Sequence, residues 1–403
     1  MAMGLSVVFG DFDIWDRCDN IRTGQQDGSI VEESMGFEEF PRRTCAERIE
    51  QLRRRMVREQ VDAYWAVATP NVRYLSGFTG NDSTLLIGAK RAVLVTDSRY
   101  SEQAETEAQV DDILVRRSRM AREVAVLCRK LDCGKIAFSS RNVSYADYRR
   151  LRSELSLRDF VPCESGWVED LRVRKDKNEL AAVGEALRFA EEAFRVFSGE
   201  ICPGKSENWL AARLEWEMRV RGAEGRAFET ICACGAHASQ PHAVATEQVL
   251  RDEPLLVDWG ATVRGYNSDL TRVVAGSTMP EGIGELSEVV LQAQEAAFDK
   301  LKPGVTCADV DRAARSAIVR AGYGRFFGHG IGHGVGLEVH EAPRVAPGEE
   351  AVLLPGMVFT IEPGIYIPGK MGVRIEEMVV ITGDGFVKIS ALPCEMLEAK
   401  AWG

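Results

Sequence analysis

The second half of the chain repeats a helical unit at a constant offset, and this repeat restricts the possible folds more than any other feature. In both copies a Pro-Gly pair is followed by a residue suited to cap a helix, and the helix predicted next stops at a glycine. The matching positions are Pro203-Gly204 with Pro303-Gly304, Ser206 with Thr306, and Gly222 with Gly322. Unless the matches are coincidental, two similar α+β halves facing each other across a site are expected.

Each helical unit is followed by β-rich sequence with acidic residues inside apolar strands. Asp258 and Asp269 lie on opposite arms of LLVDWGATVRGYNSDLTRVVAG, with a polar turn midway between them. Glu362 and Glu376 are placed in the same way about Gly369. In antiparallel hairpins the two members of each pair are expected to face each other across the ladder.

A metal cluster explains why four acids occupy such positions. Acidic residues in apolar strands are costly without a compensating positive charge, and like-charged pairs across a ladder repel. Four carboxylates balance the charge of two divalent ions, and one histidine completes a set of five ligands. Such an oxygen-rich set suits Mn²⁺, Co²⁺, Fe²⁺ or Zn²⁺ better than a thiolate site would. The alternative is surface charge on edge strands.

The five histidines of the chain are confined to its second half. His329, His333 and His340 lie within GHGIGHGVGLEVHEAP, and His237 and His242 lie upstream. Histidine is the commonest metal ligand. The glycines around it permit unusual backbone angles and close approach to a ligand. A glycine-rich turn with incidental histidines is the alternative reading.

The 403 residues are long for a single core, so two domains are expected. Residues 1–44 read as an extension of unknown role. Alternating helices and strands predict an α/β domain over 45–170, in which 71–80 is expected to be a loop. The charged segment 168–179 reads as a linker into a long helix, or as a solvated helix face within one continuous domain. The remaining domain is predicted to cover 171–403.

Bulk properties exclude several classes of protein. A net charge of −11 argues against nucleic acid as the main partner. Asp11 and Asp13 interrupt the apolar run near the N-terminus, so no signal peptide is expected, and the chain has no apolar stretch long enough to span a membrane. The ten cysteines are scattered, which predicts reduced thiols and a cytoplasmic location. A redox or metal role for Cys232 and Cys234 is the alternative there.

Taken together, DWGATVRGYNSD, GHGIGHGVGLEVHE, FTIEPGIY and VRIEE resemble the motifs of the pita-bread metallopeptidases. That family includes aminopeptidase P, prolidase and methionine aminopeptidase. NVRYLSGFTG and LVTDSRYSEQAE resemble the short bacterial Xaa-Pro peptidases. The resemblance covers about residues 45 to 403. It implies an α/β N-terminal domain, an α+β pita-bread catalytic domain built from two similar halves, and a homodimer.

The resemblance also implies a role for each matching residue. The dinuclear metal ligands would be Asp258, Asp269, His333, Glu362 and Glu376. His242 and His340 match catalytic histidines that contact substrate, and Tyr366 and Arg374 match residues lining the substrate pocket, Arg374 with a part in catalysis. Glu362 would also accept a proton from the attacking water. His329 matches a supporting position close to the metals, and His237 has no assigned role. The Glu-Glu-Met run at Glu376 departs from the commoner pattern, which puts the hydrogen bonding behind that ligand in question.

The activity expected from this resemblance is that of a metal-dependent Xaa-Pro aminopeptidase acting on proline-containing peptides, with Mn²⁺ the preferred metal. The main alternative is an Xaa-Pro dipeptidase, or prolidase. Methionine aminopeptidase is disfavoured by the long N-terminal domain. A metal-free hydrolase and a non-catalytic peptide-binding module are disfavoured because no ligand position is lost.

Overall fold

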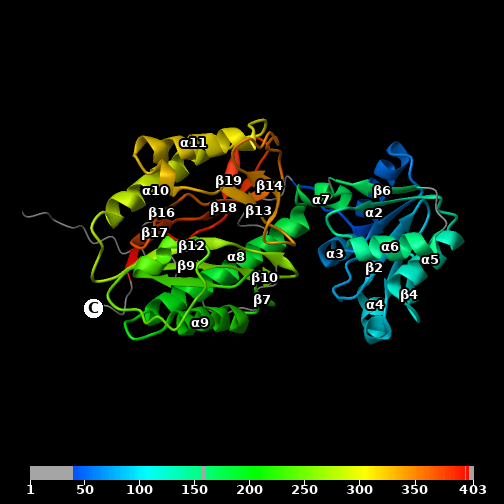
Figure 1. Cartoon of the computed structure of the whole chain (residues 1–403), viewed down its shortest axis with the longest axis horizontal. Helices are drawn as coiled ribbons and strands as arrows, with labels where there is room; N and C mark the ends of the chain where they lie inside the picture. The colour runs from blue at the N-terminus through cyan, green and yellow to red at the C-terminus, as the bar shows by residue number, and fades with distance from the viewer. Residues whose placement is uncertain (1–39, 156–158, 165, 395, 399–403) are drawn as a thin grey trace, which may run out of the picture.

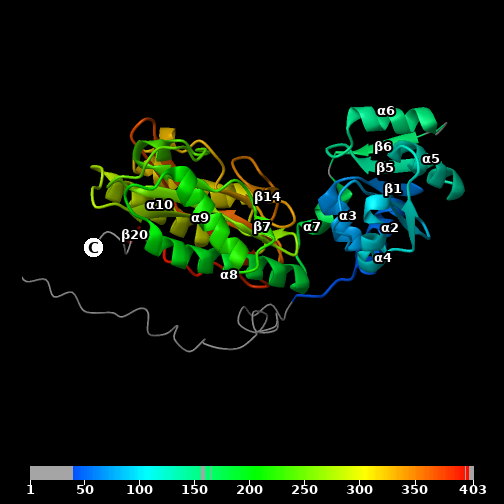
Figure 2. The ribbon, with the colours of Figure 1, turned by 90° about the horizontal axis from the view of Figure 1, so that it is seen from below.

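A computed structural model describes residues 40–155, 159–164, 166–394 and 396–398. These residues form two lobes joined through helix α7 (Trp167–Arg172), and the lobes lie side by side in both views (Figures 1 and 2). Residues 1–39 of the predicted extension lie outside the described residues. Phe40 is buried in the core of the second lobe, so the part of the predicted extension that can be seen belongs to the folded protein.

The first lobe is built on a six-stranded mixed sheet in the order β4-β3-β2-β1-β5-β6. Its strands are β1 (Ala63–Ala66), β2 (Thr84–Gly88), β3 (Ala92–Thr96), β4 (Asp112–Val115), β5 (Lys135–Ser139) and β6 (Asp159–Cys163). Its helices are α2 (Cys45–Arg58), α3 (Thr69–Ser76), α4 (Ser101–Glu107), α5 (Met120–Lys130) and α6 (Tyr145–Glu154). Leu85 packs into the core on one face and Leu86 into the core on the other. Both faces are therefore covered, which explains the continuous apolar runs of these strands and confirms the α/β prediction.

One sequence prediction in this part of the chain is wrong. The expected loop 71–80 begins inside helix α3, which has a proline in its first turn and ends at Gly77 in the left-handed region (φ 75°). Both are ordinary helix-boundary signals. The segment 168–179, expected to be a linker into a long helix, consists of helix α7, which joins the lobes (Figure 1), a short connection, and the first turn of the long helix α8 (Lys177–Phe197). Most of its charged side chains, including Arg172, Asp176 and Glu179, are buried against opposite charges from both lobes, whereas Asp170 and Arg174 are exposed.

The second lobe contains four long helices and several curved sheets (Figure 1). Its helices are α8, α9 (Glu207–Val220), α10 (Ile283–Phe298) and α11 (Cys307–Arg320). Its first group of strands is β7 (Gly225–Arg226), β8 (Ile231–Cys234), β9 (Leu255–Trp259), β10 (Ala261–Val263), β11 (Tyr266–Asn267) and β12 (Leu270–Ala275). Its second group is β13 (Gly332–Gly334), β14 (Glu341–Val345), β15 (Val358–Ile361), β16 (Gly364–Ile367), β17 (Met371–Arg374), β18 (Glu377–Ile381), β19 (Phe386–Lys388) and β20 (Leu397–Glu398). Within the described ranges, no helix has both the length and the apolar character needed to cross a bilayer.

The sequence repeat corresponds to a structural repeat. Ser206 caps α9 by accepting from the amide of Trp209, and Thr306 caps α11 by accepting from the amide of Asp309. Each capping residue also forms an isolated bridge to a later segment, Ser206 with Val249 and Thr306 with Val352. The prediction of two similar α+β halves is thus confirmed.

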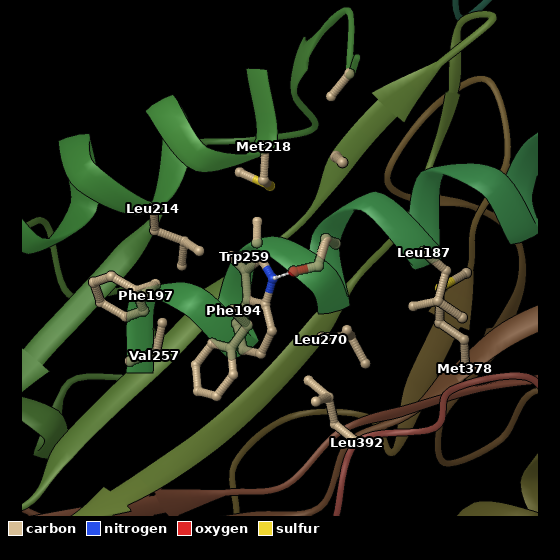
Figure 3. Close-up of a cluster of buried hydrophobic side chains, with 14 of the residues drawn as sticks. Leu187, Phe194, Phe197, Leu214, Met218, Val257, Trp259, Leu270, Met378 and Leu392 are labelled. Atoms are coloured by element: carbon tan, nitrogen blue, oxygen red, sulfur yellow. Dashed lines mark hydrogen bonds between the residues drawn. The ribbon is translucent and has the colours of Figure 1, made fainter. Parts of the chain in front are cut away.

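The core of the first half forms around Trp259, at the end of β9 (Figure 3). Its indole stacks on Phe194 of α8 at 4.3 Å between ring centroids, and its Nε1 donates to the carbonyl of Ala190 at 3.0 Å. Leu214 of α9 belongs to the same cluster. Because side chains alternate along a strand, fixing Trp259 against the helices turns Asp258 to the opposite face of β9.

Candidate metal centre and active site

The first pair of acids comes from the hairpin formed by β9–β10 and β11–β12. Its two-residue turn consists of Arg264 (φ 48°) and Gly265 (φ 74°). Two positive φ values at the turn are typical of a tight hairpin that follows the twist of its strands. The resulting register pairs Asp258 with Thr271. The expectation that Asp258 directly faces Asp269 is therefore wrong by two residues, and the two acids are diagonal neighbours on one face.

The second pair of acids lies between two ladders that share one register. Strands β15 and β18 pair Ile361 with Glu377, and β16 and β17 pair Gly364 with Arg374. Both pairings place Glu362 opposite Glu376 when they are extended by one or two residues. This arrangement agrees with the register expected from the sequence.

His333, on β13, reaches the acids from both halves. Its Nε2 lies 3.6 Å from Oδ2 of Asp269 and 3.4 Å from Oε1 of Glu362. Candidate ligand atoms of Asp269, His333 and Glu376 all lie within 4.8 Å of one another. Nδ1 of His333 is 3.2 Å from the carbonyl of Gly334, which leaves the Nε2 lone pair directed toward the acids. One ring nitrogen held by a carbonyl and the other bare is the usual state of a metal-ligating histidine.

Every site residue expected from the sequence lines one cavity of about 940 Å³. These residues are Asp258, Asp269, His242, His329, His333, His340, Glu362, Tyr366, Arg374 and Glu376. The structure therefore brings together residues separated by more than a hundred positions in the chain.

The electrostatics of the cavity wall fit a cluster of divalent cations. Burial, and then the neighbouring acids, hold the pKa of Asp269 and of Glu376 well above the usual carboxyl range. Burial also raises the pKa of Glu362. The buried Oδ1 of Asp258 makes no hydrogen bond to any described residue. Bound cations would stabilise the ionised form of each of these groups, and the unpartnered oxygen of Asp258 could coordinate one of them.

Two threonines hold Glu376 and Glu362 in place, and the sequence analysis missed both. Thr271 Oγ1 donates to Oε2 of Glu376 at 2.7 Å, and Thr360 Oγ1 lies 3.3 Å from Oε1 of Glu362. Thr360 also accepts from the amide of His333 at 3.1 Å. Each threonine stands two residues from one of the cavity's acids along the chain, Thr271 from Asp269 and Thr360 from Glu362. The two-residue side-chain period of a strand was the available signal.

Most of the N–H donors of Arg374 form hydrogen bonds within the protein. Its guanidinium donates to Oδ2 of Asp258 at 2.5 Å, to Thr271 Oγ1 at 3.0 Å and to the hydroxyl of Tyr366 at 2.7 Å. It also donates to the carbonyl of Pro241 at 3.1 Å. Burial raises the pKa of Tyr366 to about 12, so the hydroxyl stays protonated. Arg374 is thus placed to orient Asp258, with little capacity left for a substrate.

The remaining histidines surround the cavity. The rings of His340 and His333 are 4.2 Å apart. Although His340 is exposed in the open cleft, desolvation and then His333 lower its pKa to about 4, so its imidazole is neutral near pH 7. His329 holds its Nδ1 2.7 Å from the carbonyl of Gly330, and its buried Nε2 has no hydrogen-bond partner among the described residues. His242 lines the cavity on the loop after β8.

His237 has a structural partner that the sequence did not reveal. Its Nδ1 lies 2.8 Å from Oε1 of Glu207, which is fully buried at the start of α9. Glu207 also accepts from the amides of Cys234 and Thr246, at 2.8 and 3.0 Å. This carboxylate therefore fixes both ends of the loop that carries His242.

The Glu-Glu-Met run at Glu376 has a structural explanation. Glu377 pairs in full burial with Arg272 at 2.6 Å, and Arg272 donates to the carbonyl oxygens of Glu376 and Thr271 at 2.6 and 2.9 Å. The sulfur of Met378 accepts a hydrogen bond from the amide of Asp269 at 3.3 Å. The backbone that carries Glu376 is thus supported even though the run departs from the commoner pattern.

Comparison with known proteins places these features in a family. Residues 181–383 match the model of Metallopeptidase family M24, and residues 48–174 match that of the Creatinase/Prolidase N-terminal domain. An Xaa-Pro dipeptidase from Pyrococcus horikoshii is 34% identical over 87% of the chain and 99% of its own length.

Solved structures give the same result. An Xaa-Pro dipeptidase from Bacillus anthracis is 37% identical, with a TM-score of 0.85 over 88% of this chain and 100% of its own. An X-Pro aminopeptidase from Thermotoga maritima is 37% identical, with a TM-score of 0.79 over 85% of this chain and 99% of its own.

Proposed function

The chain belongs to Metallopeptidase family M24, and from that membership we propose that it is a metal-dependent Xaa-Pro aminopeptidase, which releases an N-terminal residue that precedes proline. The observation that carries this proposal is the convergence of carboxylates from both halves and one bare imidazole nitrogen on a single cavity wall. The dipeptidase and aminopeptidase relatives, whose names specify Xaa-Pro or X-Pro substrates, support the specificity for proline.

The proposed metal ligands are Asp258, Asp269, His333, Glu362 and Glu376. When bound, two divalent ions would lower the pKa of a water to about 7 and polarise the scissile carbonyl. Four carboxylates and one imidazole form an oxygen-rich set, so we propose Mn²⁺ as the metal, with Co²⁺, Zn²⁺ and Fe²⁺ as the other candidates.

The chain's own residues would then handle protons and charge. Glu362 is placed to accept a proton from the attacking water and to return it to the leaving proline nitrogen. Neutral His340, together with His242, can donate a hydrogen bond to the carbonyl oxygen as negative charge develops on it. Tyr366 and Arg374 would shape the wall beside the substrate, and Arg374 would keep Asp258 in its ligating orientation. His329, beside Glu362, would support the ligands from behind.

The cavity leaves room for a peptide longer than a dipeptide, as an aminopeptidase needs. It runs from the acids to Asn208 and Glu215 of α9, and its volume of about 940 Å³ is more than the two residues of a dipeptide would fill. The second candidate is an Xaa-Pro dipeptidase, because full-length relatives carry that name.

Hydrolysis of matched peptides distinguishes the candidates. With Mn²⁺ present, we expect Ala-Pro-Ala to be cleaved after alanine and Ala-Ala-Ala to be left intact. Cleavage of Ala-Pro with no cleavage of Ala-Pro-Ala would establish the dipeptidase instead. Equal turnover of Ala-Pro-Ala and Ala-Ala-Ala would refute proline specificity altogether.

We further propose a cytoplasmic homodimer with a domain division between 45–170 and 171–403. Support for the compartment comes from the nine described cysteines, all of which are free thiols. The proposed dimer rests on the family resemblance, and light scattering at micromolar concentration tests it. Limited proteolysis tests the domain division, since cleavage is expected near the junction rather than within either lobe.

A further inference from the structure

The segment that carries His340 lies between the two lobes. Val335 at its start is buried in the core of the second lobe. Leu337 packs against the cores of both lobes. His340 faces the cavity, and Glu341 begins strand β14 immediately after it. The position of His340 therefore depends on how the two lobes contact each other.

Glu341 is held by two cations from the segment that joins the lobes. Arg172 Nη2 lies 2.5 Å from Oε2 of Glu341, and Lys175 Nζ lies 2.7 Å from Oε1. The same Arg172 nitrogen lies 2.7 Å from Oε2 of Glu338. The side chains of Arg172, Lys175 and Glu341 are 3%, 1% and 8% exposed, so these contacts are shielded from water and salt. A side chain at Gly336 would collide with the Glu341 carboxylate, so the segment folds tightly around it.

The cations are themselves fixed on both sides. Arg172 Nη1 donates to Oδ1 of Asn71 in the first lobe at 2.8 Å. The amide of Lys175 donates to the carbonyl of Gly356 in the second lobe at 2.7 Å. Arg174, between them, forms a β-bridge with Met357. The positions of these two cations are therefore fixed by contacts other than those with Glu341.

We propose that Arg172 and Lys175 are positioning residues for the reaction, holding His340 against the metal ligands through Glu341. This inference rests on the proposed function, because the role of His340 is part of it. Glu341 is the residue next to His340, so a displaced carboxylate moves the imidazole with it. Displacement of a reacting group by about 1 Å can cost about a hundredfold in rate.

A second buried arginine offers a matched control for simple docking of the lobes. Arg48 of α2 lies 2.7 Å from Oδ2 of Asp176 at the start of α8, and it donates to the carbonyl of Tyr74 at 3.0 Å. Arg48 thus links the lobes as Arg172 does, but its hydrogen bonds and ion pairs among the described residues go to Tyr74, Asp176 and Glu179 and not to the segment from Val335 to Glu341. Loss of docking alone would affect both arginine variants alike.

The experiment combines single and double variants in a cycle. We expect Arg172→Met and Lys175→Met to lower kcat by about tenfold or more with little change in KM or metal content, and Arg48→Met to leave kcat near wild type. In a His340→Ala background, Arg172→Met should have no further effect, because the group it positions is gone. The proposal would be overturned if the double variant lost kcat by the product of the two single-variant factors. It would also be overturned if Arg48→Met lost as much kcat as Arg172→Met.

A second measurement does not depend on turnover. The chain has five histidines, so ¹⁵N-histidine labelling of the zinc-loaded protein gives a simple ring spectrum in which His340→Ala identifies the His340 signal. Arg172→Met and Lys175→Met should shift the His340 signal, whereas Arg48→Met should leave it in place. The His237 signal should stay in place in all three variants and serves as an internal reference. An unmoved His340 signal in both cation variants would refute the positioning role. Failure of wild type to cleave Xaa-Pro peptides would refute the proposed function alone, since the spectrum would still report on His340.

Discussion

Replacing Thr271 with valine tests how the second layer of the site supports the metal. The substitution keeps the shape of a fully buried side chain and removes one hydroxyl, which donates to Glu376 at 2.7 Å and accepts from Arg374 at 3.0 Å. A hydrogen bond to a charged group contributes about 1.5–3 kcal/mol. Since about 1.4 kcal/mol is a tenfold change in an equilibrium constant, loss of the bond to Glu376 should weaken metal binding by about 10–100-fold.

The assay for Thr271→Val is titration of the metal-stripped protein with Mn²⁺, followed by calorimetry. Thr230→Val is a matched control, because the Thr230 hydroxyl is also buried yet has no hydrogen-bond partner among the described residues. We expect Thr230→Val to bind Mn²⁺ as wild type does. Wild-type affinity in Thr271→Val would refute the reasoning, as would an equal loss of affinity in both variants.

The remaining predictions concern the histidines and pH. His333→Ala should lose metal by elemental analysis, whereas His242→Ala and His340→Ala should keep it and lose about 10²–10³-fold in kcat; loss of metal from His340→Ala would show that the two roles are wrongly assigned. Because the pKa of Asp269 and of Glu376 is raised in the metal-free fold, the stability these acids contribute is present at low pH and is lost as pH rises through the raised values. The increase in Tm caused by Mn²⁺ should therefore grow as pH rises from the ordinary carboxyl range through these raised values, and a constant increase would contradict the charge cluster.

Much of the fold could be predicted because its signals are local. The capping residues Ser206 and Thr306 predicted the starts of the repeated helices, and the acids within apolar strands predicted the site. The register of Asp258 was missed by two residues because it depends on which two residues form the turn, and a short polar segment allows more than one choice.

The partners of buried charges could not be predicted from their neighbours in the chain. Arg172 pairs with Glu341, which is separated from it in the chain by most of the sequence of the second lobe. Glu207 contacts His237 only because the fold brings the loop that carries His237 back to the start of α9. In the sequence, a charged run such as 168–179 looks like a solvated surface. Only the tertiary structure shows that opposite charges reach it from another lobe.

The most direct test of the account is turnover of a proline peptide as metal is returned to the stripped protein. The ligand set predicts no hydrolysis of Ala-Pro-Ala without metal, followed by a rise that saturates at about two Mn²⁺ per chain. Glu376→Gln should fail to reach that stoichiometry. Full turnover in a sample that elemental analysis shows to be free of metal would contradict the central claim.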